Sequence, residues 1–237
     1  MKPVLIVKAG TTVAGVRARR GDFEDWIAAG LGEDVPVRVA AVFEGAPLPA
    51  TAEVAAVVVT GSSAMVSARE AWSEAAAAWL ARAVAARLPV LGICYGHQLL
   101  AHALGGRVGA NPRGREIGSV DVHFDAAGDA LLGAFGPREC FQATHVESVL
   151  RLPPGARCLA ANRAEPHHAF ALRDRVWGAQ FHPEFDADVM RGYLDERRDV
   201  LAGEGIDAAR LIAATRETPS GPRLLRRFAR LVAGEFA

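Results

Sequence analysis

Three residues of the chain have the types and surroundings that nucleophilic attack on a carbonyl needs. Cys94 follows an apolar run and has one glycine two positions before it and another two positions after it. His182 also follows an apolar run, and Glu184 lies two residues beyond it. A thiolate nucleophile needs a base that takes and returns a proton, and the base needs a carboxylate that orients it. These residues therefore indicate a nucleophile, a candidate base, and a carboxylate that can fold back onto the imidazole.

The G-x-C-x-G arrangement of residues 92–96 is typical of a nucleophile elbow between a strand and a helix. Such a turn is so tight that its flanking positions cannot carry side chains, and the nucleophile is held strained and exposed. The sulfur then lies at a helix N-terminus, which favours the thiolate, and the N–H of Tyr95 points to where an oxyanion would form. A buried structural cysteine is the common alternative for a free thiol. The two glycines favour the nucleophile.

Composition limits the classes of function. Lys plus Arg and Asp plus Glu number 27 each, so the net charge gives no reason to expect a nucleic acid or an anionic membrane as partner. No apolar run approaches the roughly 18–20 residues that span a bilayer, and the N-terminal run is too short for a signal peptide. Cys94, Cys140 and Cys158 are widely separated and fit neither a disulfide framework nor a CxxC metal site. We therefore expect a cytoplasmic protein.

The other histidines receive no catalytic role. His97 and His102 are five residues apart and do not share a helix face, so they are a poor metal pair. His167 and His168 open a strand, and we expect them at the surface or in a hairpin. No metal site is predicted.

Alternating strands and helices predict the elements that position the nucleophile. The four predicted strands of the first hundred residues are Val4–Val7, Val35–Phe43, Ala55–Thr60 and Pro89–Ile93. Two amphipathic runs between them predict helices, namely Phe23–Leu31 and Arg69–Arg87. This alternation is typical of an α/β fold with a mostly parallel central sheet flanked by helices.

The pattern changes after Gly106. Short two-sided segments predict antiparallel strands and hairpins that continue the sheet or pack beside it: Glu116–Phe124, Glu139–Thr144, Val146–Leu152, Arg157–Ala161, His168–Arg173 and Val176–Gln180. From Asp186 onward the chain is predicted helical. We expect one domain over residues 1–185 and a helical C-terminal extension over 186–237 packed on it. In residues 223–232 the apolar stripe favours packing on the domain over a docking surface.

Two motifs together resemble a known family. The sequence G-I-C-Y-G-H-Q at residues 92–98, followed by F-H-P-E at residues 181–184, resembles the signature of class I glutamine amidotransferases. This is the family of the glutaminase halves of GMP synthase, anthranilate synthase and carbamoyl phosphate synthetase. The resemblance covers roughly residues 1–185 and is closest to stand-alone GMP-synthase-like proteins. It implies a flavodoxin-like fold and a catalytic triad of Cys94, His182 and Glu184.

The resemblance also implies an oxyanion hole made of backbone N–H groups. One donor is Tyr95, directly after the nucleophile. The second comes from the turn T-G-S-S at residues 60–63, which resembles the family's S-G-G-P turn. Because the proline is absent here, Gly61 and Ser62 both stay candidates for this donor.

Substrate-binding residues follow from the same resemblance. Gln98, one turn into the helix after the nucleophile, matches a glutamine whose side chain touches the substrate. Thr144, His145 and Val146 resemble a segment whose main chain reads the α-amino and α-carboxylate groups of glutamine. The family has a small residue where this chain has Val146, and His145 is equally consistent with a structural role in a hairpin.

The implied activity is release of ammonia from glutamine through a thioester on Cys94, with no cofactor. The chain has no S-G-G-V-D-S loop, no Walker A motif and no G-x-G-x-x-G after a strand, so it cannot activate an ammonia acceptor by itself. It could therefore dock on a synthetase partner, or act alone on glutamine or γ-glutamyl compounds, as a γ-glutamyl peptidase does. A non-catalytic binding partner is the third alternative. The oligomeric state stays open, and a homo-oligomer is compatible with the sequence.

Overall fold

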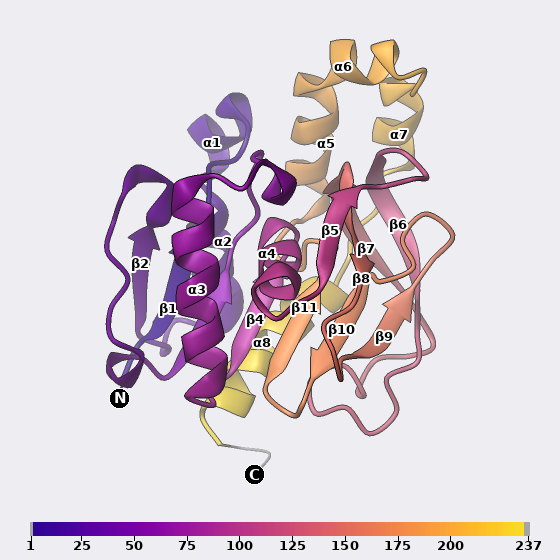
Figure 1. Cartoon of the computed structure of the whole chain (residues 1–237). Helices are drawn as coiled ribbons and strands as arrows, with labels where there is room; N and C mark the ends of the chain where they lie inside the picture. The colour runs from indigo at the N-terminus through magenta and orange to yellow at the C-terminus, as the bar shows by residue number, and fades with distance from the viewer. Residues whose placement is uncertain (1, 235–237) are drawn as a thin grey trace.

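A nine-stranded mixed sheet forms the centre of the computed structural model, which describes residues 2–234. Its strand order is β2-β1-β3-β4-β11-β10-β9-β6-β7 (Figure 1). The parallel half consists of β1 (Val4–Lys8), β2 (Val37–Ala41), β3 (Ala56–Val59), β4 (Val90–Ile93) and β11 (Val176–Ala179). The predicted fold class, a mostly parallel sheet with an antiparallel portion, is confirmed.

Antiparallel strands continue the sheet beyond β11. They are β6 (Glu116–Phe124), β7 (Arg138–His145), β9 (Arg157–Ala161) and β10 (Ala169–Leu172). A separate two-stranded sheet pairs β5 (Arg107–Ala110) with β8 (Glu147–Arg151). The sequence did not predict β5.

The predicted antiparallel pairing is confirmed on one edge of β11, and the parallel pairing on its other edge was not predicted. This strand is antiparallel to β10 but parallel to β4, with Val176 opposite Val90. Its four residues are all buried, as in a strand covered on both faces. The short turn after β10 therefore returns the chain into the centre of the parallel half, which brings the end of β11 beside the end of β4.

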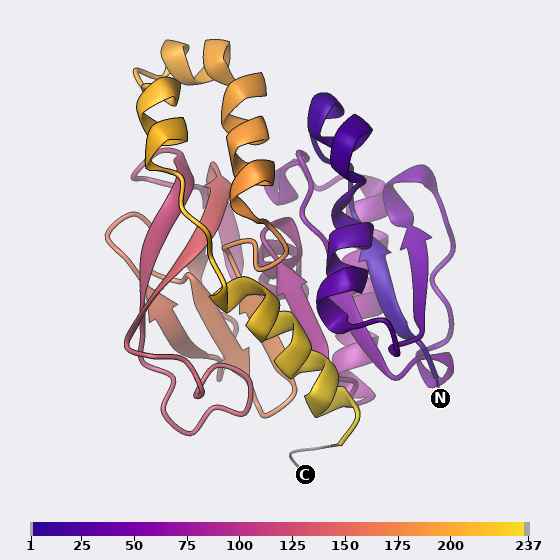
Figure 2. The ribbon, with the colours of Figure 1, turned by 180° about the vertical axis from the view of Figure 1, so that it is seen from behind.

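Helices cover both faces of the sheet (Figures 1 and 2). The strand period of two decides which residues meet which helices. Leu5 and Val7 belong to the core shared with α3 (Ala71–Ala85) and α4 (Tyr95–Ala103). Val4 and Ile6 belong to the core shared with α2 (Phe23–Leu31) and α8 (Ser220–Val232).

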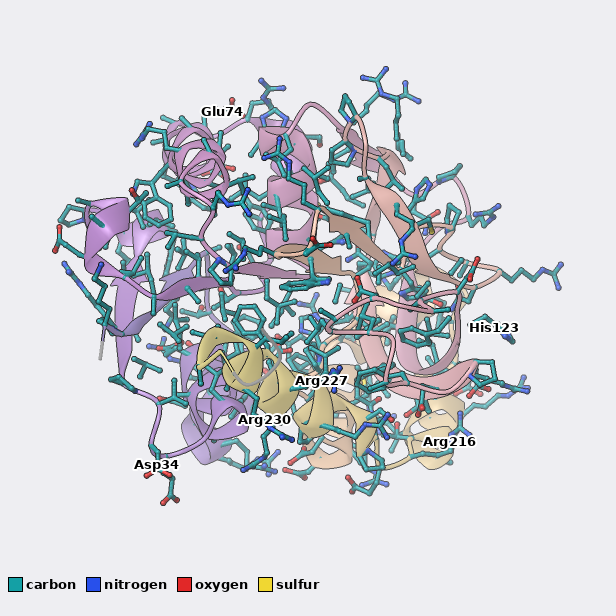
Figure 3. The ribbon with its side chains drawn as sticks, turned by 90° about the horizontal axis from the view of Figure 1, so that it is seen from below. Asp34, Glu74, His123, Arg216, Arg227 and Arg230 are labelled. Atoms are coloured by element: carbon teal, nitrogen blue, oxygen red, sulfur yellow. The ribbon has the colours of Figure 1, made fainter. Side chains whose placement is uncertain are left out.

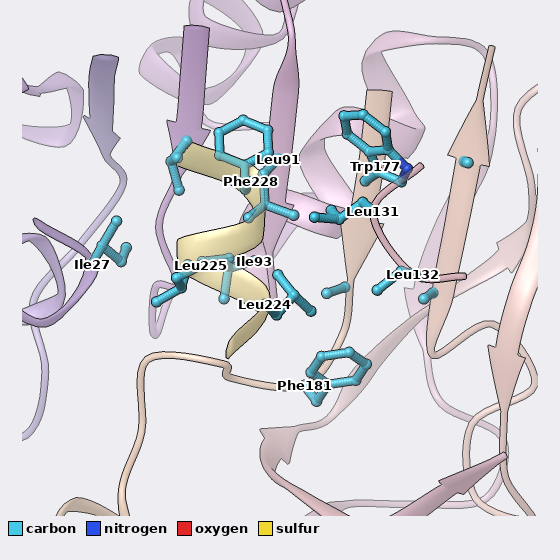
Figure 4. Packing of buried hydrophobic residues seen from close by; sticks show 14 of the residues in the cluster. Ile27, Leu91, Ile93, Leu131, Leu132, Trp177, Phe181, Leu224, Leu225 and Phe228 are labelled. Atoms are coloured by element: carbon cyan, nitrogen blue, oxygen red, sulfur yellow. The ribbon is translucent and has the colours of Figure 1, made fainter. Parts of the chain in front are cut away.

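Helix α8 packs its apolar stripe on the domain, as the sequence favoured. Leu224, Leu225 and Phe228 are fully buried against the sheet and α2 (Figure 4). Arg227 and Arg230 extend from the other side of the helix (Figure 3), and the Arg227 guanidinium donates to the carbonyl of Ala130 at 2.7 Å.

The remaining helices lie at the carboxyl end of the parallel strands (Figure 1). They are α1 (Ala14–Arg20), α5 (Ala187–Glu196), α6 (Arg198–Gly203) and α7 (Ala208–Ala214). Short 3-10 turns elsewhere in the chain occupy Val42–Glu44, Thr51–Glu53 and Val66–Ala68. Arg20 joins α1 to α5 through Asp186 and Asp188, each at 2.6 Å. Among residues 2–234, none of the helices has the length and apolarity to cross a bilayer.

Candidate active site

Three neighbouring parallel strands end at the predicted site. Gly61 and Ser62 follow β3, Cys94 follows β4, and His182 follows β11 in the loop that begins at Gln180. Because the carboxyl ends of parallel strands meet at one edge, the register of β3, β4 and β11 brings these distant segments together.

The turn at Cys94 has the geometry of a nucleophile elbow. Cys94 adopts φ 52° and ψ −104°, a conformation that is strained for a residue with a side chain, and α4 begins at the next residue. A Cβ on Gly92 would lie 2.4 Å from the carbonyl oxygen of Gly96, and a Cβ on Gly96 would lie 2.4 Å from that of Val59. Both glycines are therefore required by close backbone contacts.

Replacing Gly96 by alanine is expected to destabilise the fold by about 1–3 kcal/mol, because the new methyl group meets backbone of β3 that cannot move aside. Denaturant unfolding followed by circular dichroism measures this change. Gly203→Ala is the matched control, since a Cβ there meets no atom within 4 Å. Equal stability of the two variants would show that the close backbone contact at Gly96 does not constrain the turn.

The other two free cysteines do not lie at a turn like the one at Cys94. Cys140 and Cys158 lie on β7 and β9, and each is half-buried. Burial raises the pKa of both thiols, which disfavours the reactive thiolate. Cys94 is itself only 6% exposed, so its predicted exposure is wrong, but of the three cysteines it alone lies at a strand-to-helix turn and lines a cavity.

His182 and Glu184 form a buried pair. Nδ1 of His182 lies 2.7 Å from Oε1 of Glu184, and the two side chains are 2% and 0% exposed. Burial by itself lowers the pKa of His182, but the charges of Glu184 and Cys94 raise it above its usual value. Nε2 of His182 is buried and forms no hydrogen bond within residues 2–234. The ring is thus oriented by Glu184 and has one nitrogen left for proton transfer.

Packing fixes the plane of this imidazole. The Phe185 ring stacks on it with centroids 4.1 Å apart, and Phe23 lies parallel to it at 6.1 Å. The backbone N–H of His182 donates to the carbonyl of Gln142 at 2.8 Å, which ties the loop after β11 to β7. The His182 side chain therefore has little freedom to leave the site.

Three backbone N–H groups belong to residues next to Cys94 and His182. Within the described part of the chain, the N–H groups of Tyr95, Gly61 and Ser62 form no hydrogen bond with the protein. The Gly61 backbone comes so close to the imidazole that a Cβ there would lie 2.9 Å from Cε1 of His182. The geometry leaves both Gly61 and Ser62 as candidates for the second oxyanion donor.

A cavity of about 110 Å³ joins these groups. The residues predicted for the site that line it are Ser62, Cys94, Gln98, Thr144, His145, Val146 and His182. The sulfur of Cys94 lies 3.6 Å from the carbonyl oxygen of Thr144. The other three predicted site residues are not among the lining residues: Tyr95 directly follows Cys94, Gly61 directly precedes Ser62, and Glu184 contacts the lining residue His182.

Gln98 is engaged by the protein itself. Its side-chain amide donates to the carbonyl of Glu147 at 2.8 Å and to Oε1 of Gln180 at 3.0 Å. Gln98 therefore holds the segment that follows His145 at the cavity wall. The contact of the Gln98 side chain with the substrate stays a prediction from the family resemblance.

His145 is part of a buried polar network. Its ring nitrogens lie 3.0 Å from the carbonyl oxygen of Glu147 and 3.0 Å from Oε2 of Glu116. His168 lies 3.0 Å from the same carboxylate and is fully buried in the hairpin between β9 and β10, so of its two predicted positions, surface or hairpin, the hairpin is the one observed. Burial raises the pKa of Glu116, but the hydrogen bond with His145 and the close approach of the His168 ring outweigh burial and lower it. The pairing of β6 with β7 and β9 brings these residues together.

The sequence did not indicate the residues on the side of the cavity formed by the C-terminal extension. Tyr193 and Arg197 line that side of the cavity, and Arg115, Thr11 and Met65, which the sequence also did not indicate, line it elsewhere. Tyr193 belongs to α5, and Arg197 directly follows that helix. The helical pattern of this segment was visible in the sequence. No motif marks these positions, and arginine is too frequent in this chain for any single one to stand out.

Comparisons with known proteins identify the family of this fold. The sequence profile of the family described as glutamine amidotransferase class-I matches residues 24–196. A GMP synthase of Aeropyrum pernix is 46% identical over 40% of this chain and 18% of its own length. A separate glutamine-hydrolysing GMP synthase subunit of Natronomonas pharaonis is 36% identical over 49% of this chain and 64% of its own length.

The chain thus spans less than two thirds of the length of both relatives. A crystal structure of a glutamine amidotransferase from Methylobacillus flagellatus superposes on 100% of this chain and 94% of its own, with a TM-score of 0.78 and 26% identity. The family profile covers most of the chain, including Cys94, His182 and Glu184. The chain belongs to the class I glutamine amidotransferase family.

Proposed function

We propose that this protein releases ammonia from the side-chain amide of glutamine through a γ-glutamyl thioester on Cys94. The observation that carries the proposal is the joint placement of the Cys94 elbow and the buried His182–Glu184 pair at one cavity. Family membership gives glutamine hydrolysis as the general chemistry. The residue roles are inferred from the geometry.

In the first half-reaction the Cys94 thiolate attacks the amide carbon, and a carbon–sulfur bond forms. The carbonyl oxygen becomes an oxyanion that the N–H groups of Tyr95 and of Gly61 or Ser62 can stabilise. The imidazolium of His182 gives its proton from Nε2 to the leaving nitrogen, the carbon–nitrogen bond breaks, and ammonia departs. Glu184 holds Nδ1 throughout, so that Nε2 faces the reacting atoms.

In the second half-reaction His182 is a base. Nε2 takes a proton from water, the hydroxyl attacks the thioester, and the same N–H groups stabilise the second oxyanion. The carbon–sulfur bond then breaks, and glutamate leaves with the regenerated Cys94 thiolate. Water is the only co-reactant that the cycle consumes.

The destination of the ammonia is a separate part of the proposal. The relative from Natronomonas pharaonis is named a subunit of GMP synthase, so a glutaminase of this family can be a separate chain. We infer that this protein also supplies ammonia to a synthetase partner. The lack of a nucleotide-binding motif in the sequence supports a division of labour between two chains.

Glutamate release is the direct test of this function. The purified chain is incubated with glutamine and with a panel of γ-glutamyl peptides, alone and with synthetase subunits that lack a glutaminase. Turnover of glutamine, increased by a synthetase, is expected because docking can order the loops around an oxyanion hole. Turnover of γ-glutamyl peptides alone would replace the proposal by a γ-glutamyl hydrolase, and no turnover under any condition would refute both.

A further inference from the structure

We propose that Arg197 binds the α-carboxylate of the substrate and that Glu147 binds its α-amino group. This inference rests on the proposed function and adds two specificity-determining side chains to the main-chain contacts that the family resemblance implies for residues 144–146. The C-terminal extension then carries part of the substrate site.

Arg197 places a cation at the cavity, where it connects α5 to α6 and lines the same space as Cys94 and His182. Its Nε is buried and forms no hydrogen bond within residues 2–234, and no carboxylate of these residues lies within ion-pair distance. A guanidinium that is partly buried without a carboxylate partner loses hydration without compensation. A bound carboxylate would supply that partner in bidentate form.

Arg115, the other arginine at the cavity, differs from Arg197 because it has a carboxylate partner. Arg115 also lines the cavity, but its guanidinium is held by Glu204 through two hydrogen bonds of 2.7 and 2.8 Å. Its donors are therefore directed at the protein. Of the two arginines at the cavity, Arg197 is the one whose guanidinium N–H groups are available to a ligand.

Aromatic packing positions Arg197 relative to the catalytic base. Its guanidinium carbon lies 5.5 Å from the centroid of the Tyr193 ring, a cation–π contact. The Tyr193 hydroxyl accepts a hydrogen bond from Thr12 at 2.9 Å, and its ring packs on Phe185 at 5.0 Å. Because Phe185 in turn stacks on His182, the cation and the base belong to one rigid assembly. Such preorganisation is what a binding site for a small polar ligand needs.

Glu147 supplies the complementary charge. This residue is 5% exposed, lines the cavity and accepts a hydrogen bond on its carboxylate from the Ser67 N–H at 3.3 Å. Within the described chain no ion pair joins Glu147 to Arg197, so the two charges stay separate at the walls of one cavity. An anion and a cation held apart match the two charged groups of an α-amino acid, and a neutral amide without these groups would leave both charges uncompensated.

The test compares Arg197→Gln with the wild type on two substrates, L-glutamine and L-glutamine α-amide, which lacks the α-carboxylate. A lost charge-assisted hydrogen bond predicts that kcat/KM for glutamine falls by about ten- to a hundredfold, mainly through KM. The α-amide should react poorly with the wild type and equally poorly with the variant. Arg198→Gln is the matched control, because the Arg198 side chain is 50% exposed and bonds Asp195 outside the cavity.

A second measurement separates this proposal from the function itself. Iodoacetamide carries no α-carboxylate, so its rate of reaction with Cys94 should be the same in the wild type and in Arg197→Gln. If the wild type hydrolyses glutamine but Arg197→Gln retains its KM and its preference for glutamine over the α-amide, the Arg197 inference is wrong and the function stands. If the wild type releases no glutamate from any substrate, the proposed function fails first.

Discussion

Replacement of Cys94 by alanine is expected to lower kcat/KM for glutamine hydrolysis by at least about four orders of magnitude, because removal of a covalent nucleophile leaves only binding and the oxyanion hole. No other thiol can replace it, since burial raises the pKa of Cys140 and Cys158 on strands β7 and β9. The measurement is glutamate release, with the synthetase partner present if the wild type needs one.

The Cys94→Ala protein should still fold. The backbone at this position is strained for any side chain, and alanine adds no atom to the turn. Its unfolding temperature should stay within a few degrees of the wild type. The double variant Cys140→Ser with Cys158→Ser is the control and should keep full activity. A Cys94→Ala protein that turns over glutamine at a tenth of the wild-type rate would contradict the thioester mechanism.

Replacement of Glu184 by glutamine has the second-largest expected effect. The amide is nearly isosteric but carries no charge, so the imidazolium of His182 loses its buried partner. We expect kcat to fall on the order of 10³- to 10⁴-fold, as the loss of an orienting carboxylate does in other triads. Asp186→Asn is the matched control, because Asp186 lies two residues on and pairs with Arg20 outside the cavity.

The pH profile distinguishes this role of Glu184 from a merely structural one. In the wild type the charges of Glu184 and Cys94 raise the pKa of His182, so the imidazolium persists below that raised pKa and is lost as the pH rises through it. Without the charge of Glu184 the pKa of His182 is raised less. The alkaline limb of kcat/KM should therefore move to lower pH by about one to three units. An unchanged alkaline limb would show that Glu184 does not act on the imidazole.

Local chemistry explains why the nucleophile was predictable. The elbow at Cys94 depends on contacts within and directly beside residues 92–96, and the glycines that permit it are visible in the sequence. The same holds for the order of strand, turn and helix around it. The loop at His182 was identified because the base and its carboxylate are two residues apart.

Residues that depend on pairing between distant segments could not be predicted. His168 becomes buried because β10 lies next to β9, which places it beside the Glu116 carboxylate of β6. Val176–Ala179 takes a parallel partner because its hairpin returns it to β4. Arg197 reaches the cavity only through the packing of α5 against α1 and Phe185, and no short-range pattern encodes that contact.

The most direct test of the mechanism is covalent labelling of Cys94 by a diazo-ketone analogue of glutamine, followed by intact mass and peptide mapping. The mechanism predicts one adduct per chain, located on Cys94, slowed by added glutamine and absent from Cys94→Ala. Adducts on Cys140 or Cys158, or no adduct in a chain that also releases no glutamate, would contradict the assignment of Cys94 as the nucleophile.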